Sequence, residues 1–226
     1  MKKLLLLTLL TALTACESTG KGSSVQHTAI PGSKYLQINN GSFDRIVIHD
    51  KNVFAKYDKI IFSSLKFDKF TVKPNADNRI NRSWVLESAD KFAYDGYFKD
   101  EVLRIFDDGH AAEVFGLGAG KDTRTLYAEV RLLELDPLVA KYGAEDVGPA
   151  GRKSVISLGS LTIQILLVDS VTNEFVAVIE DGRDLAVGIS GTTQTNKATD
   201  AHVWKQAFHI WLSRLKETAT QLKTGV

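Results

Sequence analysis

Hydrophobic and polar residues alternate along several segments of this chain, which is typical of strands that bury one face. The clearest segment runs from Leu126 to Leu132 and is followed by Asp136-Pro137, which we expect to end the strand. Four other apolar segments also predict strands: Arg45 to His49, Lys59 to Phe67, Leu161 to Val168 and Phe175 to Ile179. The five residues 169–173 between the last two have the length of a hairpin loop.

Two segments follow a helical period instead. From about Trp84 to Phe106 the apolar residues recur every three or four positions, with Gly96 weakening the middle of the predicted helix. After a Gly/Thr-rich segment at 188–195, one helical stripe collects Trp204, Phe208, Trp211, Leu215 and Leu222. These elements predict an α+β fold: a mostly antiparallel sheet of about five strands with two main helices packed on it.

The first residues have the pattern of an export signal. Lys2 and Lys3 precede the apolar run from Leu4 to Leu13, and small residues lead to Ala15 and Cys16. A helix that spans a bilayer needs about 20 apolar residues, so we expect this shorter run to be removed rather than to remain as a membrane span. Cleavage is predicted between Ala15 and Cys16.

The sequence around Cys16 resembles the lipobox of bacterial lipoproteins. That resemblance implies diacylglycerol on the Cys16 sulfur and an acyl chain such as palmitate on its new amino group. Several acyl chains imply stable anchoring in a membrane. An ordinary secretory signal with an incidental cysteine is the alternative. Cys16 is the only cysteine among 226 residues, so the chain can form no intramolecular disulfide and no cysteine-based zinc site.

The composition predicts three regions: a lipoprotein signal peptide at 1–15, lipidated Cys16 with a flexible Ser/Gly/Thr-rich tether at 16–40, and a single α+β periplasmic domain at 41–226. Processing leaves 211 residues and changes the formal charge from +1 to −1, so we expect no nucleic-acid partner. Glu17 stands where aspartate would signal retention in the inner membrane of enterobacteria. We therefore expect the outer membrane, with the inner membrane as the alternative.

Short motifs in the second half of the chain resemble the uncharacterised lipoprotein family called domain of unknown function 3313, over Ile46 to Leu222. They are the loop Asp169-Ser170-Val171-Thr172-Asn173-Glu174, then Asp181, and the terminal residues Trp204, Ala207, Phe208 and Trp211. Asn173 stands where the family has a glycine, and asparagine tolerates the left-handed backbone conformation that such a turn uses. The resemblance implies no catalytic residue.

Three motifs imitate catalytic signatures without the right context. Gly116 to Lys121 resembles a phosphate-binding loop, but its glycine spacing fits neither nucleotide motif, and we expect a flexible turn. Ser63 and Lys66 have the spacing of penicillin-recognising enzymes but lie in a predicted strand, on opposite faces. Lys223-Thr224-Gly225, which imitates the distal motif of those enzymes, is expected to be a frayed terminus.

Histidines and acidic residues supply the other candidates. His202 and His209 share the polar face of the last helix, while His27, His49 and His110 are expected on the tether, at a strand end and in a loop; all five are predicted to be solvated. Acidic groups that could act as acid–base pairs or calcium ligands are Asp107 with Asp108, and Glu180 with Asp181 and Asp184. Asp169 and Thr172 are expected to fix the hairpin, and the Trp204, Phe208 and Trp211 stripe to be core.

The sequence therefore assigns no catalytic residue, cofactor or metal ligand, and only Cys16 receives a specific chemistry. We expect a non-enzymatic envelope module, tethered by lipid, that binds an envelope protein or a cell-wall component. One alternative is a periplasmic hydrolase, which requires Asp107, Asp108, Asp181 or His110 to line one pocket with perturbed pKa values. A second is binding of lipid or a small ligand between sheet and helices.

Overall fold

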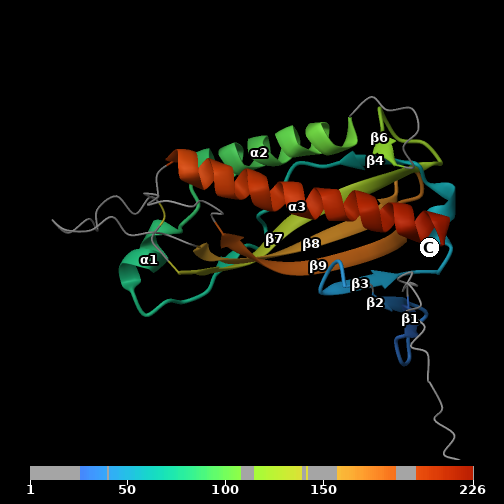
Figure 1. Ribbon diagram of the computed structural model, residues 1–226, viewed down its shortest axis with the longest axis horizontal. Helices are drawn as coiled ribbons and strands as arrows, with labels where there is room; N and C mark the ends of the chain where they lie inside the picture. Colours follow the sequence, from blue (N-terminus) through green and yellow to red (C-terminus); the bar gives the residue numbers. More distant parts are fainter. Residues whose placement is uncertain are drawn as a thin grey trace, which may run out of the picture.

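A single sheet carries two long helices on one of its faces (Figure 1). The computed structural model describes residues 26–39, 41–107, 115–138, 141, 157–186 and 197–225. The strands are β1 (Gln26–Ala29), β2 (Leu36–Asn39), β3 (Arg45–Ile48), β4 (Lys59–Phe62), β5 (Thr71–Val72), β6 (Gly116–Leu117), β7 (Thr125–Pro137), β8 (Ser157–Asp169) and β9 (Phe175–Ala186). The helices are α1 (Asn78–Ser83), α2 (Ser88–Phe106) and α3 (Lys197–Thr224), with a 3-10 turn η1 at Val53–Lys56.

The strands form a nine-stranded, mostly antiparallel sheet in the order β1-β2-β3-β9-β8-β7-β4-β6, with β5 also paired to β7. All pairs from β1 to β7 along this order are antiparallel, and the pairs that involve β4, β5 and β6 are parallel. The α+β class with a mostly antiparallel sheet is confirmed, whereas the expected number of about five strands is wrong. The strands missed are β1 and β2, in a segment without a clear apolar period, and β5 and β6, which have two residues each.

The segment from β4 to β5 follows one edge of β7. β4 pairs with Thr125–Ala128, an isolated bridge joins Lys66 to Arg131, and β5 pairs with Glu134 and Leu135. The strand predicted from Lys59 to Phe67 therefore ends at Phe62. Beyond Phe62, this segment pairs with β7 only at the Lys66–Arg131 bridge.

Residues 26–39 differ from the expected flexible tether, because they form a hairpin that extends the sheet. β1 pairs with β2 from Gln26↔Asn39 to Ala29↔Leu36, and β2 pairs with β3. Ile38 of β2 is buried, while the side chain of His27 in β1 is exposed. The first described strand begins at Gln26, so any tether that starts at Cys16 is shorter than the predicted 16–40. Cys16 and the signal-like segment lie outside the described residues.

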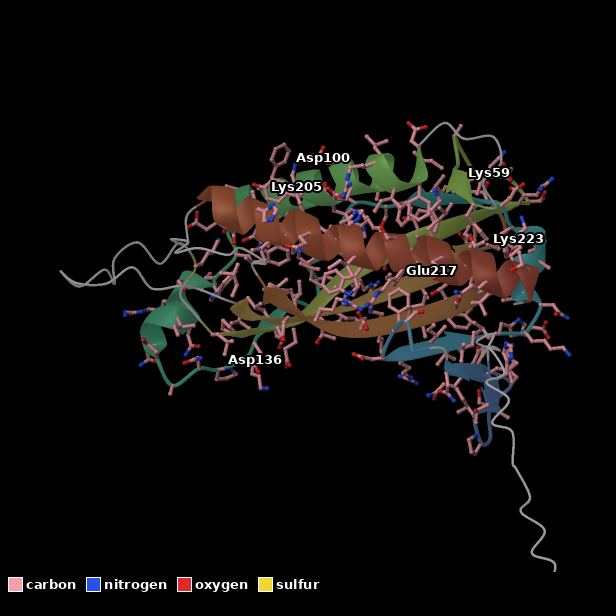
Figure 2. All side chains as sticks on the ribbon, viewed as in Figure 1. Lys59, Asp100, Asp136, Lys205, Glu217 and Lys223 are labelled. Atoms are coloured by element: carbon pink, nitrogen blue, oxygen red, sulfur yellow. The ribbon has the colours of Figure 1, made fainter. Side chains whose placement is uncertain are left out.

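Helices α2 and α3 lie side by side and run in the same direction. Tyr94 stacks on Trp204 with ring centroids 4.1 Å apart, and Phe98 meets Phe208 edge to face. On the outer surface the Lys205 ammonium of α3 lies 2.9 Å from Asp100 of α2, and Figure 2 labels both. Trp204, Phe208 and Trp211 are each at most 1% exposed, so the predicted core stripe is confirmed.

The helix predicted from Trp84 to Phe106 is divided into two. α1 ends at Ser83, Trp84 is fully buried beyond it, and α2 begins at Ser88. A capping box starts α2: the Glu87 side chain accepts from the backbone of Asp90, and the Asp90 side chain accepts from the Glu87 N–H at 2.9 Å. Glutamate is an unusual N-cap residue, which is why the local sequence did not mark this helix start.

Within the described ranges, no helix is both long and apolar enough to cross a membrane.

Candidate functional site

A groove with a volume of about 560 Å³ lies between α3 and the second half of β9. We call it the α3–β9 groove. Its walls come from three segments: the β2–β3 turn Gly41–Asp44, strand residues Asp181–Leu185, and the α3 residues Val203, Gln206, Ala207, Ile210 and Arg214. Asp181, one of the acidic residues singled out in the sequence, lies at its base.

Asp181 is 3% exposed and holds three elements together. One carboxylate oxygen, Oδ2, accepts the indole N–H of Trp211 at 2.8 Å, and the other, Oδ1, accepts the backbone N–H of Asp44 at 3.2 Å. Burial raises the pKa of Asp181, although the Trp211 N–H and the nearby Arg183 charge oppose that effect. Both oxygens are therefore engaged in holding α3 and the β2–β3 turn against β9.

Two arginines give the groove its positive charge. The Arg183 Nε lies 2.7 Å from Asp181 Oδ2, but its N–H does not have hydrogen-bond geometry there, so the contact is an ion pair. Arg214 comes from α3, and its Nη1 donates to the backbone carbonyl of Ser42 at 2.9 Å. No carboxylate within the described ranges forms an ion pair with Arg214, which therefore keeps a net positive charge for an anionic group.

An exposed stretch of β9 also contributes polar groups to the groove. Gly182 N–H donates to Asp44 Oδ2 at 2.8 Å, and Gly182 and Asp184 are both exposed although they lie within a strand. The arrangement offers backbone hydrogen bonds and charges of both signs around a fixed, buried carboxylate. This chemistry suits binding of a polar or peptide-like molecule.

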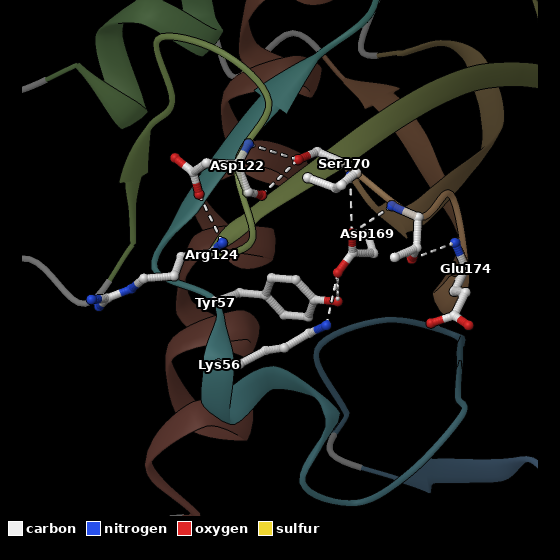
Figure 3. A network of polar contacts seen from close by, with 9 residues as sticks. Lys56, Tyr57, Asp122, Arg124, Asp169, Ser170 and Glu174 are labelled. Atoms are coloured by element: carbon white, nitrogen blue, oxygen red, sulfur yellow. Dashed lines mark hydrogen bonds and ion pairs between the residues drawn. The ribbon is translucent and has the colours of Figure 1, made fainter.

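A second polar cluster fixes the β8–β9 hairpin (Figure 3). Asp169 Oδ1 accepts the backbone N–H groups of Val171 and Thr172, each at 2.9 Å, while Oδ2 accepts Lys56 Nζ at 2.7 Å and the Tyr57 hydroxyl at 3.0 Å. Burial would raise the pKa of Asp169, but these donors outweigh burial and hold the pKa well below its usual value. The prediction that Asp169 fixes the hairpin is confirmed. Asn173 has the predicted left-handed conformation, with φ of 59°.

A third cluster, which the sequence did not reveal, joins α2, α3 and Lys141. Asp200 at the start of α3 is 8% exposed, and the Tyr94 hydroxyl of α2 lies 3.4 Å from its Oδ2. Lys141, also buried, lies 2.5 Å from Asp90 of α2. Burial raises the pKa of Asp200 to about 6, with Lys141 opposing the shift. Tyr94 and Asp200 are 106 residues apart in the sequence, so no local pattern marks the cluster.

The histidines are only partly as predicted. His27, His49 and His202 are exposed, which agrees with the prediction, and His110 lies outside the described residues. His209 is a correction, because its Nδ1 lies 3.3 Å from Glu101 Oε2 and also contacts the Arg104 guanidinium. The polar face of α3 meets α2 at this point, so His209 belongs to the interface between the helices.

The predicted acidic groups do not come together in one place. Asp181 lines the α3–β9 groove and Asp184 lies at its rim, whereas Glu180 pairs with Arg45 on the opposite face of the sheet, 3.3 Å away. Asp107 caps the C-terminus of α2 and is not part of the groove, and Asp108 lies outside the described residues. The described structure contains no group of three or more His, Cys, Asp or Glu side chains that could hold a metal ion.

The motifs that imitate catalytic signatures have structural roles. Gly116 and Leu117 form β6 rather than a flexible turn, and Gly118 packs so closely on Ile61 that a Cβ would lie 2.9 Å from its Cγ2. Ser63 follows β4, outside any helix, and its hydroxyl donates to the Ser64 carbonyl at 3.0 Å. The predicted frayed terminus is wrong for Lys223 and Thr224, since α3 continues to Thr224.

The fold and the groove define a two-layer α+β protein with a polar groove between α3 and the part of β9 that extends beyond β3. No family model matches the chain, and no curated protein does so. A PelC variant from Paraburkholderia phytofirmans, solved as a dodecamer, is 11% identical over 72% of this chain and 88% of its own, with a TM-score of 0.36. A DUF330 protein from Xanthomonas campestris is 15% identical over 75% of this chain and 85% of its own, also at 0.36. Likenesses this weak support no statement about function.

Proposed function

We propose that this chain is a bacterial lipoprotein, anchored by lipid on Cys16 in the outer membrane, whose periplasmic domain is a non-enzymatic binding or accessory module. The observation that carries the binding role is the α3–β9 groove. Its buried carboxylate, Asp181, is saturated by structural donors, while the Arg214 charge and the exposed residue Asp184 remain available to a partner. An envelope protein or a cell-wall component could contact the protein there.

The anchor is supported by the sequence before the fold. A short apolar run leads to Ala15 and Cys16, as in the lipobox, and Cys16 is the only cysteine in the chain. The ten residue steps from Cys16 to Gln26 span at most about 35 Å when extended. Because β1 and β2 belong to the sheet, this reach is much shorter than that of a tether ending at residue 40. The domain would therefore stay close to the membrane surface.

Fractionation of cell envelopes tests the anchor. The wild-type protein should sediment with outer-membrane markers, and Cys16→Ser should appear in the soluble periplasmic fraction with an unchanged circular dichroism spectrum. Cys16 is not among the described core residues, so the unchanged spectrum serves as the control that Cys16→Ser is folded. Retention of Cys16→Ser in the membrane would contradict the proposal, and wild-type protein with inner-membrane markers would contradict the outer-membrane assignment.

The binding role is tested by crosslinking in intact envelopes followed by purification of the wild-type protein. A partner that is recovered with the wild type and lost with Arg214→Gln would support the groove as the contact site. Recovery of no partner, together with turnover of a defined substrate by the purified protein, would replace the proposal with the hydrolase alternative.

A small ligand is the second candidate for the groove. The observation in its favour is the groove volume of about 560 Å³, which lies within the range of small-molecule sites, about 300–1,000 Å³. A small ligand co-purified in stoichiometric amount and displaced by Arg214→Gln would favour this candidate over a macromolecular partner.

A further inference from the structure

Strand β9 has an open edge along the α3–β9 groove. β9 pairs with β8 over most of its length but with β3 only over Ala177–Glu180. In Figure 1, β3 accordingly lies beside only one part of β9. In the part of the chain that the structure describes, no strand pairs with residues 181–186 on the β3 side.

The hydrogen bonds of β3 show which backbone groups face this edge. His49 N–H donates to the Val176 carbonyl at 3.0 Å, so the backbone groups of even-numbered β9 residues point toward β3. The same alternation directs the N–H and C=O groups of Gly182 and Asp184 to the edge where β3 has ended. Gly182 N–H already has a side-chain acceptor there, Asp44 Oδ2. An edge with outward backbone donors and acceptors is a template for another strand.

The charges differ between the two sides of this edge. Asp181 and Leu185 are buried under α3, so Arg183 faces the helix and the side chain of Asp184 points to the opposite side. On the helix side, the Arg183 charge is paired with Asp181, while Arg214 has no carboxylate partner among the described residues. On the other side, Asp184 is exposed and has no described cation within ion-pair distance. The helix side is therefore positive and the outer side negative.

We propose that the β9 edge at Gly182 and Asp184 takes an extended polypeptide segment of a partner protein as an added strand. The partner segment carries an acidic side chain toward Arg214 and basic side chains toward Asp184. Backbone pairing supplies affinity in this mode of recognition, and alternate side chains supply specificity. The inference rests on the proposed binding function and specifies its site and the chemistry of its partner.

Two synthetic peptides test this pattern against the mature lipoprotein in detergent. The first, Thr-Val-Lys-Glu-Lys-Val-Thr, presents Val and Glu on one face and Lys on the other when extended. The second, Thr-Val-Glu-Lys-Glu-Val-Thr, exchanges the charges between the faces. Fluorescence anisotropy of labelled peptides should show that the first binds at least about tenfold more tightly, and that Arg214→Gln removes this preference.

Substitutions at Asp184 test the backbone contribution. Asp184→Pro removes the N–H that faces the open edge, so it should abolish peptide binding. Because this N–H makes no ladder bond to β8, the β8–β9 pair should keep its hydrogen bonds. Asp184→Ala is the matched control: it keeps the N–H, so it should retain binding of the first peptide at reduced affinity. Unfolding temperatures of the two variants within a few degrees of wild type would show that the fold is preserved.

Several results would overturn the inference. They are equal binding of both peptides, no binding of either at up to about 1 mM, or undiminished binding by Asp184→Pro. Self-association of the mature protein that Asp184→Pro abolishes, without peptide binding, would assign the edge to a second copy of this chain. The proposed function is tested separately, by fractionation and by crosslinking in envelopes. A negative peptide test with positive results in those two experiments would therefore overturn only the β9-edge inference.

Discussion

Asp181 is the residue on which the groove depends, because its carboxylate accepts from Trp211 and from the Asp44 backbone. Asp181→Ala would leave the buried indole N–H without an acceptor and Arg183 without its counter-ion. We expect a loss of about 3 kcal/mol in the free energy of unfolding, measured by urea denaturation. Asp181→Asn should lose less, because its amide oxygen can still accept the Trp211 N–H. Equal losses for the two variants would contradict this role.

Asp200 should make stability depend on pH. Its folded-state pKa of about 6 lies above the unfolded value of about 3.9, so the folded state binds the proton more tightly. The stabilisation from the proton is complete below about pH 4 and is lost as the pH rises through 6; the difference corresponds to about 3 kcal/mol.

Asp200→Asn, which mimics the protonated form, provides the measurement for this pH dependence. The variant should be more stable than wild type at pH 7.5, where burial disfavours the charged carboxylate, and should have no such advantage at pH 4. Urea denaturation at both pH values checks the prediction. An advantage of Asn that is the same at both pH values, or larger at pH 4, would contradict it.

Two glycines provide a prediction at the scale of the elements. Gly159 in β8 has φ of 135°, and a Cβ there would lie 2.2 Å from the Asp136 carbonyl oxygen of β7. Gly159→Ala should therefore destabilise the β7–β8 pair by about 2 kcal/mol or more. Gly96 in α2 has open space around it, so Gly96→Ala should stabilise the protein by about 0.5–1 kcal/mol through helix propensity. Thermal unfolding of the two variants should shift in opposite directions; a shift in the same direction would contradict the account.

The elements that sequence predicted best are those whose burial follows a strict period. β7, β8, β9 and α3 each present one side to a single core, and Leu126 to Leu132 and Trp204 to Trp211 show that period directly. The Asp169 hairpin was also predictable, since its bonds join residues two and three positions apart. The β1–β2 hairpin was missed because it lies at the sheet edge, where burial imposes little pattern.

The groove was predictable only in part. Asp181 stood out as one of several acidic residues, but its partner Asp44 is 137 residues away and Arg214 lies on another element. The open edge of β9 depends on where β3 ends, which is a property of strand pairing and not of local sequence. The same limitation applies to Asp200, whose pKa is set by groups from α2 and by Lys141.

For the molecule as a whole, the proposed lipid on Cys16 would join a membrane anchor to the proposed binding domain through a short connection. The first described strand begins at Gln26, close to Cys16 in sequence, and the sheet continues through β2 and β3 to the edge of β9. The groove is therefore part of a sheet whose first described strand would be held near the membrane by the proposed anchor. A partner bound at the β9 edge would be held near the same surface, which is the advantage of combining an anchor with a binding site.

The proposed anchor requires Cys16 to be the lipid-modified first residue of the mature protein. Intact-mass analysis of the protein purified from envelopes, followed by fragmentation of its amino-terminal peptide, determines whether Cys16 carries this modification. We expect a chain that lacks residues 1–15 and carries diacylglycerol and an additional acyl group on Cys16. A mature chain with an unmodified Cys16, or one that retains the first fifteen residues, would contradict it.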